Sequence, residues 1–289
     1  MKNDIFDFKR FGNYFVTDIK NAIANYGWAM ITLILSGLIA YIVTGLVSTI
    51  ATYSWQDILN GVGVKWVHTD VYGRLTTMLI AFTFLSFTAP TKCYGGLTDK
   101  NTGSNFILLP ASRLEKFISM ILMCCIVIPT VFLAGYLVVD SLICSVCPEA
   151  GKGIIAGISN AVNEILAEEE IPIEIIDRIN LASAIDDTWM IFLFFLLGAL
   201  VFKKSKAIKT FLVGYGITVV ISIVGIIVIV AHSADIDTFF DTFAIGKTEE
   251  ELGMALLGYM DKMMLFDTIF DITINALLLT GIWFKLKTL

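Results

Sequence analysis

"GWAMITLILSGLIAYIVTGLVSTIA", residues 27–51, contains no Asp, Glu, Lys or Arg. A helix needs about 20 consecutive apolar residues to cross the hydrocarbon core of a bilayer, so this stretch predicts a membrane-spanning helix. The whole chain agrees, because 57% of its 289 residues are hydrophobic and only 16% are charged. A soluble domain has roughly 25% charged residues. The sequence therefore predicts an integral membrane protein.

Further apolar stretches of similar composition follow, with more polar segments between them. We predict an all-α fold whose transmembrane domain covers residues 27–289. Residues 1–26 carry apolar positions at helical spacing and predict a cytosolic helix that lies along the membrane interface ahead of the first span. The six predicted spans are about 27–51, 75–92, 117–140, 187–203, 208–232 and 263–284.

Lys and Arg residues are distributed unevenly over the segments between these spans, with 14 on one side and 6 on the other. Because cytoplasmic segments carry the excess of Lys and Arg, we expect both termini in the cytoplasm. The outer side then holds two long segments, 141–186 and 233–262. Apolar residues share one helical face over 153–170, and 248–260 begins with capping-box spacing, so each predicts an amphipathic outer helix.

No enzyme motif is complete in the chain. The tripeptide GKT at 246–248 matches the end of a phosphate-binding loop, but that motif needs Gly where Asp241 stands, and a preceding strand. We therefore expect neither catalysis nor a bound cofactor in this chain. Nucleic-acid binding is not expected either, because no basic patch is interleaved with aromatic residues and the pI is about 5.0. For Cys144 and Cys147, free thiols, a local disulfide and a metal site stay open.

Asp267, Asp271 and Asn275 recur every fourth residue in the last predicted span and share one helical face. A charge at the centre of a span costs about 2.5–3.5 kcal/mol on insertion scales and is often functional. Three interpretations stay open. The carboxylates reach water or Lys262 at the outer rim, the stripe lines a translocation path, or it couples transport to protons.

The segment between the second and third predicted spans contains "NTGSNFILLPASRLEK", residues 101–116. Ser112 and Glu115 have capping-box spacing and predict a helix that begins near Arg113 and continues into the third span. Pro110 favours a break just before that helix. The segment SNFILL, residues 104–109, predicts one or two helical turns that begin near Ser104. Its apolar residues 106–109 would be exposed, which implies a partner or the membrane surface.

These residues resemble the cytosolic loop of the permease subunits of type-2 ABC exporters, on the strength of Asp99, Gly103, the sequence Leu108-Leu109-Pro110-x-Ser112, Arg113, Glu115 and Lys116. In that family a coupling helix in this loop docks into a separate ATP-binding cassette subunit. Two permease chains, identical or different, pair with two such subunits. The outer segment 141–186 is longer than the family pattern.

The resemblance implies an ATP-driven exporter subunit in a bacterial cytoplasmic (inner) membrane, with ATP and Mg bound by the partner subunit. It implies a partner-binding loop made of Gly103, Ser104, Phe106, Leu108, Leu109, Pro110, Ser112 and Glu115. Two other functions stay open. One is a stand-alone secondary transporter that uses Asp267 and Asp271, although no internal repeat or pair of broken helices is visible. The other is a non-transporting membrane scaffold or sensor.

Overall fold

The computed structural model describes residues 6–53, 55–61, 65–67, 71–98, 110–147, 150, 153–157, 159–160, 181–231 and 249–288. Every regular element in these ranges is helical, which confirms the predicted all-α class. The main elements are α1 (Phe8–Thr52), α2 (Trp55–Asn60), α3 (Val71–Tyr94), η1 (Gly95–Thr98), α5 (Arg113–Leu122), η2 (Met123–Val127), α6 (Ile128–Val146), α9 (Leu181–Val201), α10 (Lys206–Ala231) and α12 (Glu249–Thr288).

Five helical segments in the described part of the chain are long and apolar enough to cross a membrane. They are Phe8–Thr52, Val71–Thr98, Arg113–Val146, Lys206–Ile227 and Asp261–Thr288. Each overlaps one predicted span. The remaining predicted span, 187–203, corresponds to a shorter apolar helix, Asp187–Val201, within α9. The architecture is that of an all-α membrane protein.

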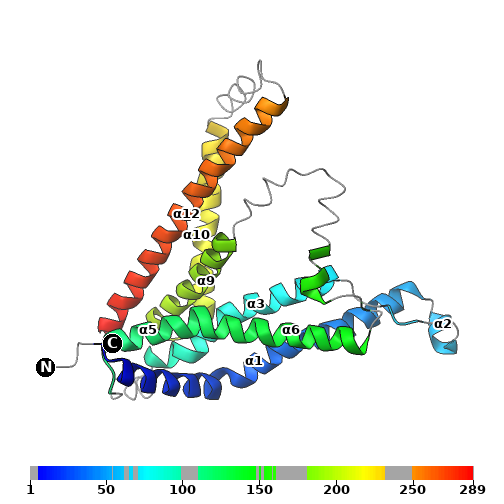
Figure 1. Ribbon diagram of the computed structural model, residues 1–289, viewed down its shortest axis with the longest axis horizontal. Helices are drawn as coiled ribbons and strands as arrows, with labels where there is room; N and C mark the ends of the chain where they lie inside the picture. The colour runs from blue at the N-terminus through cyan, green and yellow to red at the C-terminus, as the bar shows by residue number, and fades with distance from the viewer. Residues whose placement is uncertain are drawn as a thin grey trace.

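Two predicted helices are not separate elements. The interfacial helix expected within residues 1–26 is the first part of α1, which is helical from Phe8 to Thr52 and bends along its length (Figure 1). The described part of the outer helix expected at 248–260 is likewise the first part of α12. No proline lies at either junction. Gly27 and Gly258 lie near these junctions, and a glycine inside a helix costs only about 0.5–1 kcal/mol relative to Ala. Unlike proline, glycine keeps its backbone N–H donor, so the helix can continue through it.

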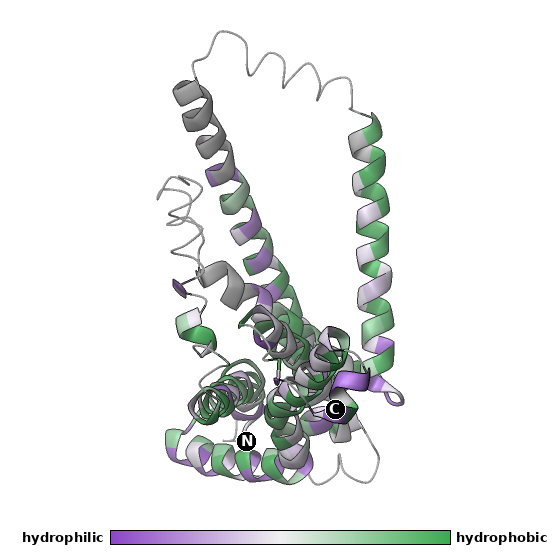
Figure 2. Cartoon of the chain, turned by 90° about the vertical axis from the view of Figure 1, so that its right-hand side faces the viewer, coloured by the Kyte–Doolittle hydropathy of each residue, from purple (hydrophilic) through white to green (hydrophobic). Residues whose placement is uncertain are grey.

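The helices form two arms that diverge from one end of the molecule (Figure 1). The first arm contains α1, α3 and the continuous segment α5–η2–α6, and the second contains α9, α10 and α12. Helix α9 packs against α3 as well as α10 and α12, so it joins the two arms. Figure 2 shows α10 standing apart from the other helices over most of its length. Its described side chains from Tyr215 onward are all exposed.

Glycine allows α1 and α6 to approach closely within the first arm. A Cβ atom placed on Gly37 would lie 2.7 Å from Cζ of Tyr136, and one on Gly135 would lie 2.7 Å from Cδ1 of Ile34. Carbon atoms in contact are normally about 3.5–4.0 Å apart. The helix spacing therefore requires the absence of side chains at these positions, as in other small-residue interfaces between membrane helices.

The long helical segment Arg113–Val146 contains a π-helical turn, η2, between α5 and α6. Pro129 follows this turn and has no N–H to donate to the carbonyl of Cys125 four residues earlier. The N–H of Ile128 bonds instead to the carbonyl of Met123, five residues back. The missing α-helical hydrogen bond explains why the wider turn lies here and not elsewhere in the helix.

Candidate functional site

The capping box predicted at the end of the loop between the second and third predicted spans is present. The backbone N–H of Glu115 donates to Oγ of Ser112 at 3.2 Å, and the N–H of Ser112 donates to Oε2 of Glu115 at 2.8 Å. Helix α5 accordingly begins at Arg113, as the sequence predicted. Pro110 is exposed just before it. The other predicted loop residues, Gly103, Ser104, Phe106, Leu108 and Leu109, lie outside the described residues.

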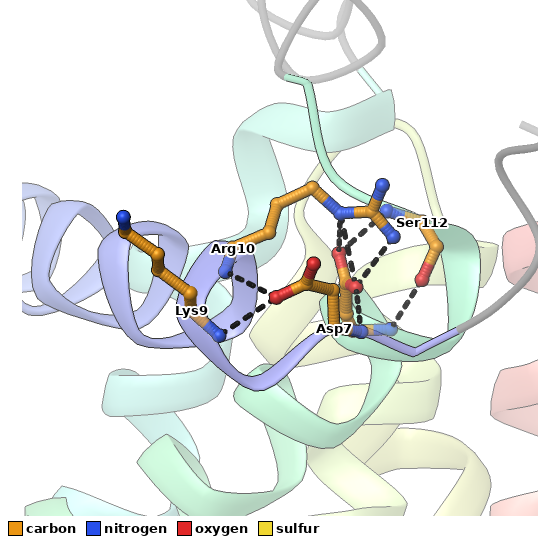
Figure 3. Close-up of polar contacts among 5 residues, drawn as sticks. Asp7, Lys9, Arg10 and Ser112 are labelled. Carbon is orange, nitrogen blue, oxygen red and sulfur yellow. Dashed lines mark hydrogen bonds and ion pairs between the residues drawn. The ribbon is translucent and has the colours of Figure 1, made fainter.

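Glu115 also holds the beginning of α1. Its Oε1 accepts a hydrogen bond from the N–H of Asp7 at 2.9 Å. The guanidinium of Arg10 contacts both carboxylate oxygens, with Nε 3.0 Å from Oε1 and 2.8 Å from Oε2, and Nη2 2.7 Å from Oε1. Figure 3 shows Asp7, Arg10 and Ser112 gathered in this cluster. One fully buried carboxylate therefore ties the first turn of α1 to the first turn of α5.

Asp7 is in turn the N-cap of α1. Its Oδ1 accepts from the N–H of Lys9 at 2.8 Å and from that of Arg10 at 3.2 Å (Figure 3). Asp and other short polar residues are favoured at this position because they satisfy N–H groups that have no partner inside the helix. The cap fixes where α1 begins, and so places Arg10 beside Glu115.

A second polar cluster lies deeper in the first arm, at Asp18. Its Oδ2 accepts hydrogen bonds from the hydroxyls of Tyr94 at 2.8 Å and Ser119 at 2.6 Å. All three side chains are buried. They come from α1, α3 and α5, so this carboxylate connects three helices close to the point where the loop leaves and re-enters the bundle.

The beginning of the loop is held by the other arm. Nζ of Lys206, in the first turn of α10, donates to the carbonyl of Gly95 at the start of η1. Oγ1 of Thr98 donates to the carbonyl of Phe202 at 3.4 Å. Residues 99–109 are therefore preceded by a helix bonded to the α9–α10 turn and followed by a helix bonded to α1. We call the end of the molecule that contains these two anchors the loop end.

A surface cleft of about 440 Å³ opens at the loop end. Its wall consists of the first turns of α1, and Pro110 closes one side. The lining is mixed in charge and polarity and includes Asp7, Arg10, Asn13, Tyr14 and Thr17. This cleft is adjacent to the place where the loop rejoins the bundle, so an element that contacts the loop would also meet α1.

The three residues of the predicted polar stripe on α12 differ in their burial. Asp271 is buried, Asn275 is half-buried, and Asp267 is exposed. Oδ1 of Asn275 is buried and has no hydrogen-bond partner among the described residues. Asp271 and Asn275 are thus brought inside the protein, whereas Asp267 is not part of the same environment.

An ion pair that sequence reasoning missed lies in the first arm, away from the loop end. Nη1 of Arg74 is 3.0 Å from Oδ1 of Asp140, and both side chains are almost completely buried. Oδ2 of Asp140 also accepts from the N–H of Ile154 at 2.7 Å. Asp140 is the last residue of the predicted span 117–140. A carboxylate at the end of an apolar span could have suggested a positively charged partner. Its pairing with Arg74, 66 residues away, had no signal in the sequence.

Cys144 and Cys147 are free thiols rather than a disulfide. Nη1 of Arg74 donates to Sγ of Cys144, which places this cysteine at the edge of the buried ion pair. No group of three or more His, Cys, Asp or Glu residues suited to a metal ion occurs in the described ranges. Free thiols, a local disulfide and a metal site were the three alternatives for this pair of cysteines, and the structure has free thiols.

Comparison of the chain with protein-family models, with curated proteins and with solved structures found no match. The function is therefore inferred from the chain's own sequence and geometry.

Proposed function

We propose that the chain is the transmembrane subunit of an ATP-driven exporter of the type-2 ABC class. In this proposal the loop at 101–116 docks onto a separate ATP-binding cassette subunit, which binds ATP and Mg and performs the hydrolysis. The chain itself has no catalytic role. A second permease chain, identical or different, completes the assembly in a bacterial cytoplasmic membrane.

The observation that carries the proposal is the double anchorage of the loop. Its entry is bonded to the second arm through Lys206 and Gly95, and its exit is bonded to the first arm through Arg10 and Glu115. A force applied to the loop by a docked subunit would reach both arms through short, direct contacts. The arms diverge from the loop end, so a small displacement there would change their separation at the far end (Figure 1).

The loop end also has the form that a docking site needs. Pro110 is exposed, the adjoining cleft offers both charges and neutral donors, and the capping box fixes the direction in which the loop emerges from α5. Rigid-body rocking of helix groups is a common way in which transporters alternate access to a central site. The predicted apolar run 106–109 would supply the contact with the partner.

The test is co-purification of the tagged chain from its native membrane in mild detergent. We expect a P-loop ATPase, identified by mass spectrometry, in a stoichiometric complex that hydrolyses ATP. The double variant Phe106→Ala/Leu109→Ala should lose this subunit and its ATP hydrolysis. The matched control is Trp55→Ala/Leu59→Ala, which removes two exposed apolar side chains from α2, at the other end of α1.

Two results contradict the proposal. The first is the absence of any P-loop ATPase from a wild-type preparation that is folded and monodisperse. The second is retention of the ATPase subunit, with unchanged hydrolysis, in Phe106→Ala/Leu109→Ala.

A secondary transporter is a second candidate, and the burial of Asp271 favours it. A buried carboxylate within a membrane helix is a frequent element of cation-coupled and proton-coupled transport. This candidate predicts gradient-driven flux without ATP that is lost in Asp271→Asn and kept in Asp267→Asn, because Asp267 is exposed. The third possibility, a scaffold or sensor, predicts complex formation without flux.

A further inference from the structure

An apolar groove of about 170 Å³ runs between α1, α3 and the π-helical turn of the first arm. Its floor contains Tyr26, Met123 and Ile128, which are all less than 5% exposed. Its rim contains Ile23 and Val131, which are 64% and 50% exposed. The site is therefore open along one side and lined almost entirely by apolar atoms.

The π-helical turn accounts for this hollow. Residues Met123–Val127 form a wider turn than an α-helix, and Met123 and Val127 both face the groove. Opposite them, Gly27 contributes no side chain, so α1 leaves space where another residue would project. Such π-helical turns occur frequently at functional sites.

The size and lining indicate a flexible hydrocarbon ligand. An apolar cavity of about 150 Å³ holds a benzene molecule, so this groove has room for several methylene groups of an acyl chain. It lies in helices long enough to span a bilayer, where phospholipid chains are the abundant apolar molecules. Among the residues that line the groove, the polar side-chain groups are the Cys93 thiol and the Tyr26 hydroxyl, which is 2.6 Å from Oγ1 of Thr88.

Two exposed lysines are sequence neighbours of residues that line the groove. Lys20 follows the lining residue Ile19, and Lys92 precedes the lining residue Cys93; both lysines are exposed. The nearest acidic residue on α1, Asp18, is buried and bonded to Tyr94 and Ser119 inside the arm. A lysine side chain can lie along an apolar surface and place its ammonium group in polar surroundings, where lipid phosphates are found. Lys20 and Lys92 are therefore the exposed charged residues of α1 and α3 that adjoin groove-lining positions in the chain.

We infer that this groove binds one acyl chain of an anionic phospholipid, with its phosphate held by Lys20 at the end of the groove. The inference does not depend on the proposed export function. The groove is proposed as a lipid-binding site within one chain. The loop end, in contrast, is proposed as the docking site of a protein partner.

Gly27 gives a direct way to fill the groove. A Cβ atom at this position would meet only Cγ2 of Ile23, at 3.4 Å, which is an ordinary contact. Gly27→Leu should therefore fold and project into the space that the acyl chain would occupy. Gly216→Leu is the matched control, because a Cβ atom there has no neighbour within 4 Å on α10. Val131→Trp fills the groove from its exposed rim and serves as a second variant if Gly27→Leu does not fold.

The experiment uses the full chain in liposomes that contain phosphatidylglycerol with a photoactivatable diazirine on one acyl chain. Peptide mapping after illumination should locate the label in residues 19–30 and 123–131. Gly27→Leu or Val131→Trp should reduce this labelling about tenfold, since each methylene excluded from an apolar site weakens binding several-fold. Gly216→Leu should leave it unchanged. Lys20→Gln should lower the preference for phosphatidylglycerol over phosphatidylcholine about fivefold.

Two results would overturn the inference. Equal labelling of the groove segments in wild type and in both filled variants would mean that only the general lipid surroundings are labelled. Labelling of α10 without labelling of either groove segment would mean that another helix, such as one from a second copy, covers the groove.

Discussion

Arg10 and Glu115, which are 105 residues apart in the chain, form a bidentate ion pair that joins the first turns of α1 and α5. The carboxylate is fully buried, and the arginine side chain is 31% exposed. The same carboxylate completes the capping box of α5 and accepts the N–H of Asp7. Three groups, the Arg10 guanidinium and the N–H groups of Asp7 and Ser112, thus depend on one side chain at the start of α5.

Removal of the capping serine tests the local part of this arrangement. Ser112→Ala should lower the free energy of unfolding by about 0.5–2 kcal/mol, because the N–H of Glu115 loses its acceptor at the helix start. Ser141→Ala is the matched control, since the Ser141 hydroxyl is exposed and bonds only to a carbonyl of its own helix. Thermal unfolding in detergent measures both. Equal effects of the two substitutions would refute a specific capping role.

The ion pair itself is tested by a double-mutant cycle of Arg10→Gln and Glu115→Gln. Glu115→Gln should be the more destabilising single change, because the carboxylate also accepts from Asp7 and Ser112. The double variant should be no less stable than Glu115→Gln alone, since residues in one network are not additive. Salt should narrow the difference between wild type and Arg10→Gln, because the arginine is partly exposed. Additive effects in the cycle would show that the two residues act independently.

The buried pair of Arg74 and Asp140 should respond differently. Arg74→Met leaves an uncompensated buried carboxylate and should lower the free energy of unfolding by about 3–5 kcal/mol. Arg74→Met/Asp140→Leu removes both charges and should recover much of that loss. Arg113→Met, at an exposed arginine, is the control. Melting temperatures in detergent report the order of stability, and a double variant less stable than Arg74→Met would contradict the prediction.

The approach of α1 to α6 predicts strong sensitivity at Gly37. Gly37→Ala should destabilise the protein by about 1–3 kcal/mol, because the new methyl group meets the ring of Tyr136 at 2.7 Å and forces repacking. Gly216→Ala makes the same chemical change where no atom lies within 4 Å. That control should be neutral or slightly stabilising, since Ala favours the helix by about 0.5–1 kcal/mol. A tolerated Gly37→Ala would mean that the two helices are not held at this distance.

The sequence by itself determined the elements that local composition controls. Long apolar runs such as 27–51 predicted the candidate membrane helices, because about 20 consecutive apolar residues match the thickness of the hydrocarbon core of a bilayer. Ser112 and Glu115 predicted the start of α5, since both partners of a capping box lie within one helical turn. The sequence did not predict that α1 and α12 each continue from the segment outside the predicted span into the span, because no helix-breaking proline marks or excludes such a junction.

Only the tertiary structure decided which distant groups share an environment. Arg10 with Glu115, Lys206 with Gly95, and Arg74 with Asp140 are brought together by helix packing, and no periodicity in the sequence relates them. The same packing buries Asp271 and exposes Asp267, although both lie on one predicted helical face. Helical spacing fixes which residues share a face. The neighbouring helices decide which part of that face is covered.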